Sequence, residues 1–252
     1  MAAPARTATA APTAAAARRH LRALADPEAA RVARWYFKTG PGEYGAGDRF
    51  LGIRAAPMRA AARRFADLPL GQIERLLASP WHEDRSLALL VLTDRFRRAA
   101  AAERAAIVRF YLAHTERIDN WDLVDLSAPH ILGEWLADRP RGGLTRLAAS
   151  PNLWERRIAV LATLAFIRRG EFGDTLRLAR RLRDDPHDLL HKAVGWMLRE
   201  VGKRDVAVLR RFLDAHGPRL PRTALRYAIE RLRPAERRRY LAMERPTRRP
   251  KR

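Results

Sequence analysis

SPNLWERRIAVLATLAFIRRG (150–170) and DPHDLLHKAVGWMLREVGKRD (185–205) follow the same sequence pattern. Each opens with a capping residue and a proline that we expect to occupy the first turn of a helix, and each continues with apolar residues at helical spacing. The two prolines lie 35 residues apart, and this spacing recurs along the chain. The prolines that follow this period are Pro80, Pro151, Pro186 and Pro221. The period predicts one more near Thr115–Glu116, where the sequence has no proline. A period of about 35 residues with helical content is typical of helical-repeat proteins.

The rest of the chain also shows helical periodicity. Residues 27–37, 55–65 and 70–78 carry apolar stripes, and we expect Asp26 to be the N-cap of the first of these helices. Gly40–Asp48 is rich in glycine and is expected to be a loop. No stretch alternates apolar and polar residues between turn residues, as a strand would. We therefore predict an all-α fold, an α-solenoid of about six helix pairs. Equivalent positions of the repeats stack along one surface of such a fold, and we expect a basic concave face.

The two ends of the chain differ in composition from its middle. Residues 1–17 are rich in alanine, proline and threonine, and we expect a disordered leader there rather than a secretory signal. Residues 243–252 form a basic tail that would add non-specific affinity for phosphate. Between them we predict a single domain, residues 18–242. No apolar run approaches the ~18 residues of a transmembrane helix, so we expect no contact with a membrane.

The charge of the chain points to an anionic partner. Lysine and arginine number 50 against 28 acidic residues, which gives a formal net charge of +22 and a pI near 11.6. Such an excess favours nucleic acid first and an anionic membrane second, with a solubilising surface as the alternative. The absence of cysteine excludes disulfides, thiolate metal sites and a cysteine nucleophile, and it fits a reducing cytoplasm, where we expect the protein.

Basic side chains recur at one position of the repeat. Five residues after each proline position the sequence has Arg85, Trp121, Arg156, His191 and Arg226. In a solenoid these side chains would stack along one surface and could contact a polyanion. The candidate DNA contacts are Arg156, His191, Lys192, Arg199, Lys203, Arg222 and Arg226. A solvated helix face is the alternative for five of them, and a contact at a helix end is the alternative for His191. The five are Lys192, Arg199, Lys203, Arg222 and Arg226.

A candidate site combines tryptophans, a carboxylate and an arginine. Trp121 and Asp125 are four residues apart and so share one helix face. Arg157 follows Trp121 by 36 residues, which is one repeat, and Trp196 lies in the repeat after that. We expect these four residues to cluster across three adjacent repeats. The alternatives are a core position for Trp121 and a solvated charge for Arg157.

Two histidines raise the question of a metal. His187 and His191 are four residues apart, so both could face one ion from a helix. No third ligand and no glutamate of an HExxH pattern accompanies them. We therefore expect neither a metal nor a cofactor.

Several long runs resemble one family. These are YFKTGPGEYGAGDRFLGI (36–53), IDNWDLVDLSAP (118–129), LWERRIAVLATLAFIRRGEF (153–172), HDLLHKAVGWMLREVGKRD (187–205) and PRTALRYAIERL (221–232). They are similar to the bacterial AlkD-type DNA alkylation repair family, and the resemblance covers about residues 20–242. It implies a stack of HEAT-like repeats and a monofunctional DNA glycosylase that removes purines alkylated at N3 or N7 from duplex DNA. The site that it implies is Trp121, Asp125, Arg157 and Trp196.

The chemistry of that reaction suits these residue types. A cationic alkylpurine is already a good leaving group, so the enzyme has to stabilise an oxocarbenium-like sugar and place a water. Asp125 can oppose the developing positive charge and orient the water, and tryptophan faces attract cations. We expect Arg157 to grip a flanking phosphate bidentately.

Other functions remain open from the sequence. A DNA-binding solenoid without catalysis would share the charge and the fold, and a solenoid for an acidic protein partner would share the fold. We expect a monomer without an obligate protein partner, acting on alkylated duplex DNA. The implied site contains no lysine, so we expect no Schiff-base lyase step.

Overall fold

The computed structural model describes residues 11–244, and all regular elements within this range are helical. One isolated bridge, between Arg49 and Trp81, is the only β-type pairing in the same range. The predicted all-α helical-repeat fold is thus confirmed. The described residues divide into two compact units, one up to Ile107 and one from Val108. The division falls inside α6 (Ala101–Ala113), where we had expected a single domain over residues 18–242.

The first unit is built from short helices around one long helix. Its helices before α6 are α1 (Ala14–Ala23), α2 (Pro27–Tyr36), α3 (Ala55–Arg64), α4 (Leu70–Leu77) and α5 (His82–Arg98). Helices α3 and α4 both pack against α5. The predicted N-cap Asp26 is confirmed, because its carboxylate accepts the backbone N–H groups of Glu28 and Ala29.

The predicted leader overlaps the first helix. We expected disorder over residues 1–17, but α1 begins at Ala14, and the Thr13 hydroxyl accepts the N–H of Ala16 as its cap. Ala14 and Ala17 are buried, so the first turn of this alanine-rich helix packs into the unit. Residues 1–10, and the tail beyond Glu244, lie outside the described residues.

The glycine-rich segment 40–48 forms turns, as predicted, and its last residue is anchored in the first unit. The Asp48 carboxylate lies 3.0 Å from the His82 ring nitrogen Nδ1 and 2.8 Å from a guanidinium nitrogen of Arg85. Burial would raise the pKa of Asp48, but His82 and Arg85 outweigh it and hold the pKa below its ordinary value. This polar cluster fixes the end of the loop to the start of α5.

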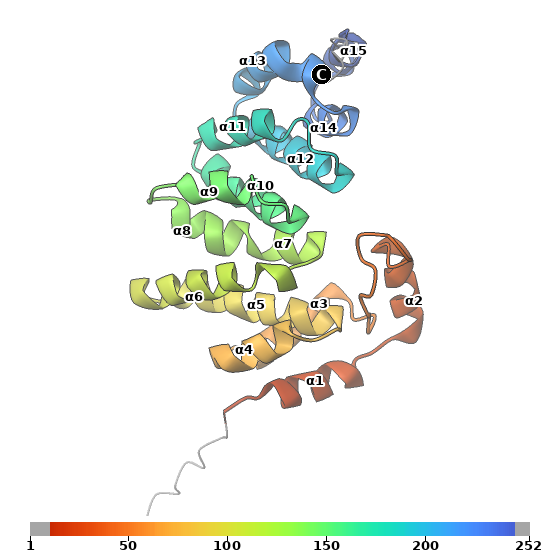
Figure 1. The fold of residues 1–252 in the computed structure, drawn as a ribbon, viewed down its shortest axis with the longest axis vertical. Helices are drawn as coiled ribbons and strands as arrows, with labels where there is room; N and C mark the ends of the chain where they lie inside the picture. Colours follow the sequence, from red (N-terminus) through yellow and green to blue (C-terminus); the bar gives the residue numbers. More distant parts are fainter. Residues whose placement is uncertain (1–10, 245–252) are drawn as a thin grey trace, which may run out of the picture. The chain divides into compact units, whose positions relative to one another are not determined.

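The second unit is a stack of helices. Its helices are α7 (Trp121–Ser127), α8 (Glu134–Leu136), α9 (Gly142–Leu147), α10 (Leu153–Arg168), α11 (Gly173–Arg181), α12 (Asp188–Arg204), α13 (Val206–His216), α14 (Arg222–Ala228) and α15 (Pro234–Ala242). Helix α12 packs against α10 on one side and α14 on the other. Helices α11 and α13 lie to the left of α12 and α14 in Figure 1. The unit therefore has two layers, and α10, α12 and α14 form one of them.

Each long helix that follows a proline of the 35-residue period is preceded by the same kind of turn. The Ser79 hydroxyl accepts the N–H of Trp81, the Ser150 hydroxyl that of Asn152, and an Asp185 carboxylate oxygen that of His187. The helices start at residues 82, 153 and 188, in each case one residue after the residue whose N–H is bound in this way. The prediction that proline itself occupies the first helical turn is therefore wrong for these three helices. The proline lies in the preceding turn, which its side chain stiffens.

The recurring basic residues close that turn. Arg85 donates to the Ser79 carbonyl at 3.1 Å, and Arg156 donates to the Ser150 carbonyl at 3.0 Å. The His191 ring nitrogen Nε2 lies 2.6 Å from the Asp185 carbonyl oxygen. These bonds satisfy carbonyls of the turn that precedes each helix. The architecture of the helix starts thus accounts for the basic residues at three of the recurring positions, Arg85, Arg156 and His191.

Gly195 allows α12 and α14 to approach closely. A Cβ atom at this position would lie 2.5 Å from both the Ala224 carbonyl oxygen and the Tyr227 Cβ. Backbone cannot move aside cheaply, so we expect Gly195→Ala to lower the free energy of unfolding by about 1–3 kcal/mol. The control is Gly71→Ala in α4, where a Cβ would meet nothing within 4 Å. Thermal unfolding followed by circular dichroism measures both; equal stability of the two variants would contradict the packing.

Candidate functional site

A buried ion pair connects two of the residues that the sequence singled out. The Arg157 Nε donates to Asp125 Oδ1 at 3.0 Å, and Nη2 donates to Oδ2 at 2.9 Å. Arg157 comes from α10 and Asp125 from α7. The side chains are 5% and 17% exposed, respectively, so the carboxylate retains limited access to solvent. Two parallel bonds of this kind fix the plane of a carboxylate as well as its position.

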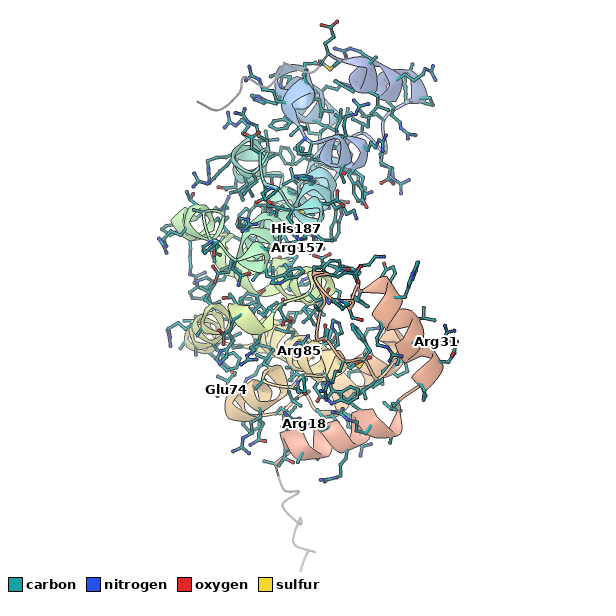
Figure 2. All side chains as sticks on the ribbon, turned by 45° about the vertical axis from the view of Figure 1, so that its right-hand side comes forward. Arg18, Arg31, Glu74, Arg85, Arg157 and His187 are labelled. Carbon is teal, nitrogen blue, oxygen red and sulfur yellow. The ribbon has the colours of Figure 1, made fainter. Side chains whose placement is uncertain are left out.

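The same guanidinium reaches a third helix. Arg157 Nη1 donates to the carbonyl of Leu189 at 2.6 Å, in the first turn of α12. Figure 2 shows Arg157 beside His187, the N-cap of α12. The expected role of Arg157 as a phosphate contact is therefore corrected. Its side chain is buried, and its nitrogens donate to Asp125 and Leu189, so it positions the carboxylate and joins α7, α10 and α12.

Burial dominates the electrostatics of Asp125. It raises the pKa of the carboxyl above its ordinary value, and the neighbouring Asp122 adds to this increase. The guanidinium of Arg157 opposes the effect without cancelling it. The raised pKa makes this carboxylate a better proton acceptor than an exposed aspartate.

Trp121 begins the short helix that carries Asp125. The Asn120 side chain caps α7 by accepting the N–H of Trp121 at 2.8 Å, and Asn120 is fully buried. Trp121 is half-buried and lies one turn before Asp125, on the same face of α7. Further along α7, Ser127 and the buried Tyr111 hydroxyl lie 3.0 Å apart, which holds the helix against α6. The sequence prediction that Trp121 and Asp125 share a face is confirmed.

Trp196 is oriented by a residue that the sequence analysis missed. Its indole Nε1 donates to Glu200 Oε1 at 3.0 Å, one turn along α12. The spacing of four residues between them was the available signal. Trp196 lies seven residues after Leu189, the residue that Arg157 contacts, and so on the same face of α12. The structure thus joins Asp125 and Arg157 directly, and α12 links Trp196 to them.

Two of the candidate DNA contacts have internal roles. Arg156 pairs with the Asp185 carboxylate at 2.7 Å, and its side chain is only 14% exposed. It also donates to the carbonyls of Ser150 and Pro151. The His191 ring bonds the Asp185 carbonyl. Both residues therefore hold helix starts in place, and the structure does not leave them available as predicted.

The remaining candidates differ in how strongly they are engaged. Lys192 pairs with Asp188, Lys203 pairs with Glu200, Arg199 pairs with Glu230, and Arg222 donates to the Leu241 carbonyl. The lysine side chains remain about two-fifths exposed in these pairs. Arg226 is exposed and makes no hydrogen bond or ion pair within residues 11–244. Arg226 is therefore the candidate best placed to contact a phosphate.

The two spaced histidines are used within the protein. The His187 side chain accepts the N–H of Leu189 as the cap of α12, and His191 bonds the preceding turn. In the part of the chain that the structure describes, no three His, Cys, Asp or Glu side chains are grouped to hold a metal ion. Within residues 11–244, no helix has both the length and the apolar character needed to cross a membrane.

One family model matches most of the chain. A family model described as "DNA alkylation repair enzyme" matches residues 17–232. The fold is similar to a solved structure titled "Predicted DNA alkylation repair enzyme from Enterococcus faecalis", with a TM-score of 0.65 and 21% identity over 83% of this chain and 97% of that chain. No curated protein matches. Because the family model spans most of its length, the chain belongs to the DNA alkylation repair enzyme family.

Proposed function

We propose that the protein is a monofunctional DNA glycosylase of base-excision repair. It hydrolyses the N-glycosidic bond of purines that carry an alkyl group at N3 or N7 in duplex DNA. Family membership supports a role in DNA repair. The observation that carries the proposal is the carboxylate of Asp125, held by two bonds from a buried arginine and preceded by a tryptophan one turn away.

The reaction needs little acid catalysis, because an N3- or N7-alkylated purine is cationic and leaves as a neutral base. Bond cleavage generates positive charge on the deoxyribose. In the proposed mechanism Asp125 stabilises that charge and accepts a proton from the attacking water, which adds to C1′. Trp121 and Trp196 present aromatic faces to the cation, each contributing about 0.5–2 kcal/mol.

Arg157 acts in this mechanism through Asp125. A carboxylate that rotated freely would lose part of the benefit of orientation, and the bidentate pair prevents rotation. The Leu189 carbonyl, in turn, fixes the guanidinium. Arg157 is thus a positioning residue in the proposal.

The raised pKa of Asp125 leads to a prediction about pH. The mechanism needs the ionised carboxylate, so the rate falls as acidification protonates it. Because burial raises this pKa, we expect the acidic limb to have its midpoint above the value of about 3.9 for an ordinary aspartate. Single-turnover rates measured across the acidic range, on DNA lesions that are stable over the assay, locate the midpoint. A midpoint at or below the ordinary value would count against Asp125 as the titrating group.

The proposed function is tested by the products formed from duplex DNA that contains N7-methylguanine. We expect free base and a DNA strand with an abasic site that breaks only after treatment with alkali. Strand breakage without alkali would indicate lyase chemistry and exclude the monofunctional assignment. Binding of the DNA without release of base would leave a DNA-binding protein without this activity.

The way in which the protein binds DNA can be tested separately from its catalysis. We propose that the protein, as a monomer, contacts the phosphates mainly through exposed cations such as Arg226. The affinity for unmodified duplex should then fall steeply with salt, with a slope of about −0.9 per phosphate neutralised on logarithmic axes.

A further inference from the structure

A cavity lies in the second unit, in the layer that does not contain α10, α12 and α14. It has a volume of about 520 Å³ and lies between α11 and α13. Its apolar lining includes Phe172, Leu176, Val208 and Phe212. Asp125 and Arg157 come from α7 and α10 and line no part of it. The cavity has no role in the catalytic mechanism proposed above.

The polar side chains that line the cavity are two arginines and one histidine, with no carboxylate among them. Arg180, Arg211 and His216 line it beside the apolar side chains. Arg180 and Arg211 are exposed, and their side chains make no hydrogen bond or ion pair with other residues of the described range. The carboxylate of Asp214, on the same helix as Arg211, is paired with Arg239 at 2.8 Å. The cavity therefore carries a positive charge that the protein itself does not neutralise.

The pKa of His216 reflects the same positive charge around the cavity. Burial lowers the pKa of His216, and the cations Arg180, Arg219 and Arg183 lower it further. The ring lies 4.9 Å from that of Phe212, measured between centroids, which places it at the boundary of apolar and charged lining. An occupant with both an apolar and an anionic part would match this boundary.

We propose that the cavity between α11 and α13 is a docking site for an acidic peptide segment of a partner protein. A large apolar side chain of the segment fills the hollow, and carboxylates beside it pair with Arg180 and Arg211. The volume lies within the range of pockets that take such groups. Charge complementarity selects the acidic peptide. A DNA backbone would satisfy the guanidinium groups but would leave the apolar lining uncovered, so we favour the peptide.

Fluorescence polarisation with the full chain tests the proposal. The probes are labelled peptides of four aspartates followed by Leu-Phe, Leu-Trp or Ile-Leu, and the matched control peptide ends in Ser-Ser. We expect at least one apolar-ended peptide to bind at least ten-fold more tightly than the control peptide. The double variant Arg180→Glu/Arg211→Glu should lose at least ten-fold in affinity for that peptide.

A second double variant separates local from general charge effects. Arg181→Glu/Arg204→Glu changes the net charge by the same amount at exposed positions that do not line the cavity. We expect it to bind the peptide within about three-fold of the wild type. Circular dichroism confirms that both double variants are folded.

Three results would overturn the proposal. The first is that no apolar-ended peptide binds below millimolar concentration. The second is an equal loss of peptide affinity in both double variants, which would indicate general electrostatics. The third is a larger loss of duplex DNA affinity in Arg180→Glu/Arg211→Glu than in the control variant, which would make this face a nucleic-acid surface.

Discussion

Asp125→Asn is expected to reduce the release of alkylated base by roughly 10²–10⁴-fold while the affinity for the same DNA changes by less than about three-fold. The substitution keeps the size of the side chain but removes the charge that opposes the developing cation. It also removes the proton acceptor for water. DNA binding should persist, because the Asp125 carboxylate is only 17% exposed and its negative charge would repel a phosphate rather than bind it.

The control for this variant is stability. Asparagine turns one acceptor of the Arg157 pair into a donor, so Arg157 keeps a buried charge without its full partner. Single-turnover rates at saturating enzyme remove any effect of a reduced folded fraction, and circular dichroism verifies the fold. A rate near the wild-type value in a folded Asp125→Asn protein would contradict the mechanism.

Arg157→Met is expected to lower the free energy of unfolding by about 3–5 kcal/mol. Methionine fills part of the volume but leaves the Asp125 carboxylate without its guanidinium donors and removes one of the bonds to the Leu189 carbonyl. Both groups are poorly hydrated, so the loss is not recovered from water. Chemical unfolding at neutral pH measures the difference.

The same variant distinguishes a positioning residue from a phosphate contact. A positioning role predicts slower base release with an unchanged salt dependence of DNA binding. The matched variant Arg226→Ala should do the opposite, with a salt slope that is shallower by about 0.9 and a nearly unchanged rate at saturation. A shallower salt slope in Arg157→Met would restore the phosphate role that the structure argues against.

Acidification gives a further readout on the Arg157→Met protein. Without the guanidinium, the pKa of Asp125 in the folded state should rise further, because burial is then unopposed by a cation. A folded-state pKa above the unfolded value favours folding at low pH, and this contribution is lost as the pH rises through the raised pKa. The stability deficit relative to the wild type should therefore shrink as the pH falls through that range.

The helical-repeat fold could be predicted because its signals are local or strictly periodic. The 35-residue spacing of prolines and the apolar stripes depend on neighbours along the chain. The Asp26 cap and the turns at 40–48 follow from local chemistry in the same way. The alanine-rich start of α1 was missed because alanine gives no hydrophobic contrast, although Thr13 was available as a cap signal.

The roles of the basic residues could not be predicted in the same way. Arg156 and Arg157 are adjacent, and a helix separates adjacent side chains by about 100°. One of them pairs with Asp185 and the other with Asp125, partners 29 and 32 residues away in sequence. Composition shows a cationic excess, but only the packing of α7 and α10 shows which cation is used internally. The same holds for His191, whose partner is a backbone carbonyl.

The family resemblance placed four residues in the site, and the structure accounts for them unequally. Asp125 and Arg157 are in direct contact, which supports a common function for the two. Trp121 depends on the cap formed by Asn120, and Trp196 on its bond to Glu200. Neither Asn120 nor Glu200 stood out in the sequence, because asparagine and glutamate are ordinary residues at helix starts and on helix faces.

The most direct test of the central claim is the release of free base from duplex DNA containing N7-methylguanine and, separately, N3-methyladenine, by wild type and Asp125→Asn side by side. We predict release by the wild type and a loss of release in Asp125→Asn, with similar DNA binding by both. Release by both proteins at the same rate, or by neither protein from either lesion, would contradict the assignment of a glycosylase that acts through Asp125.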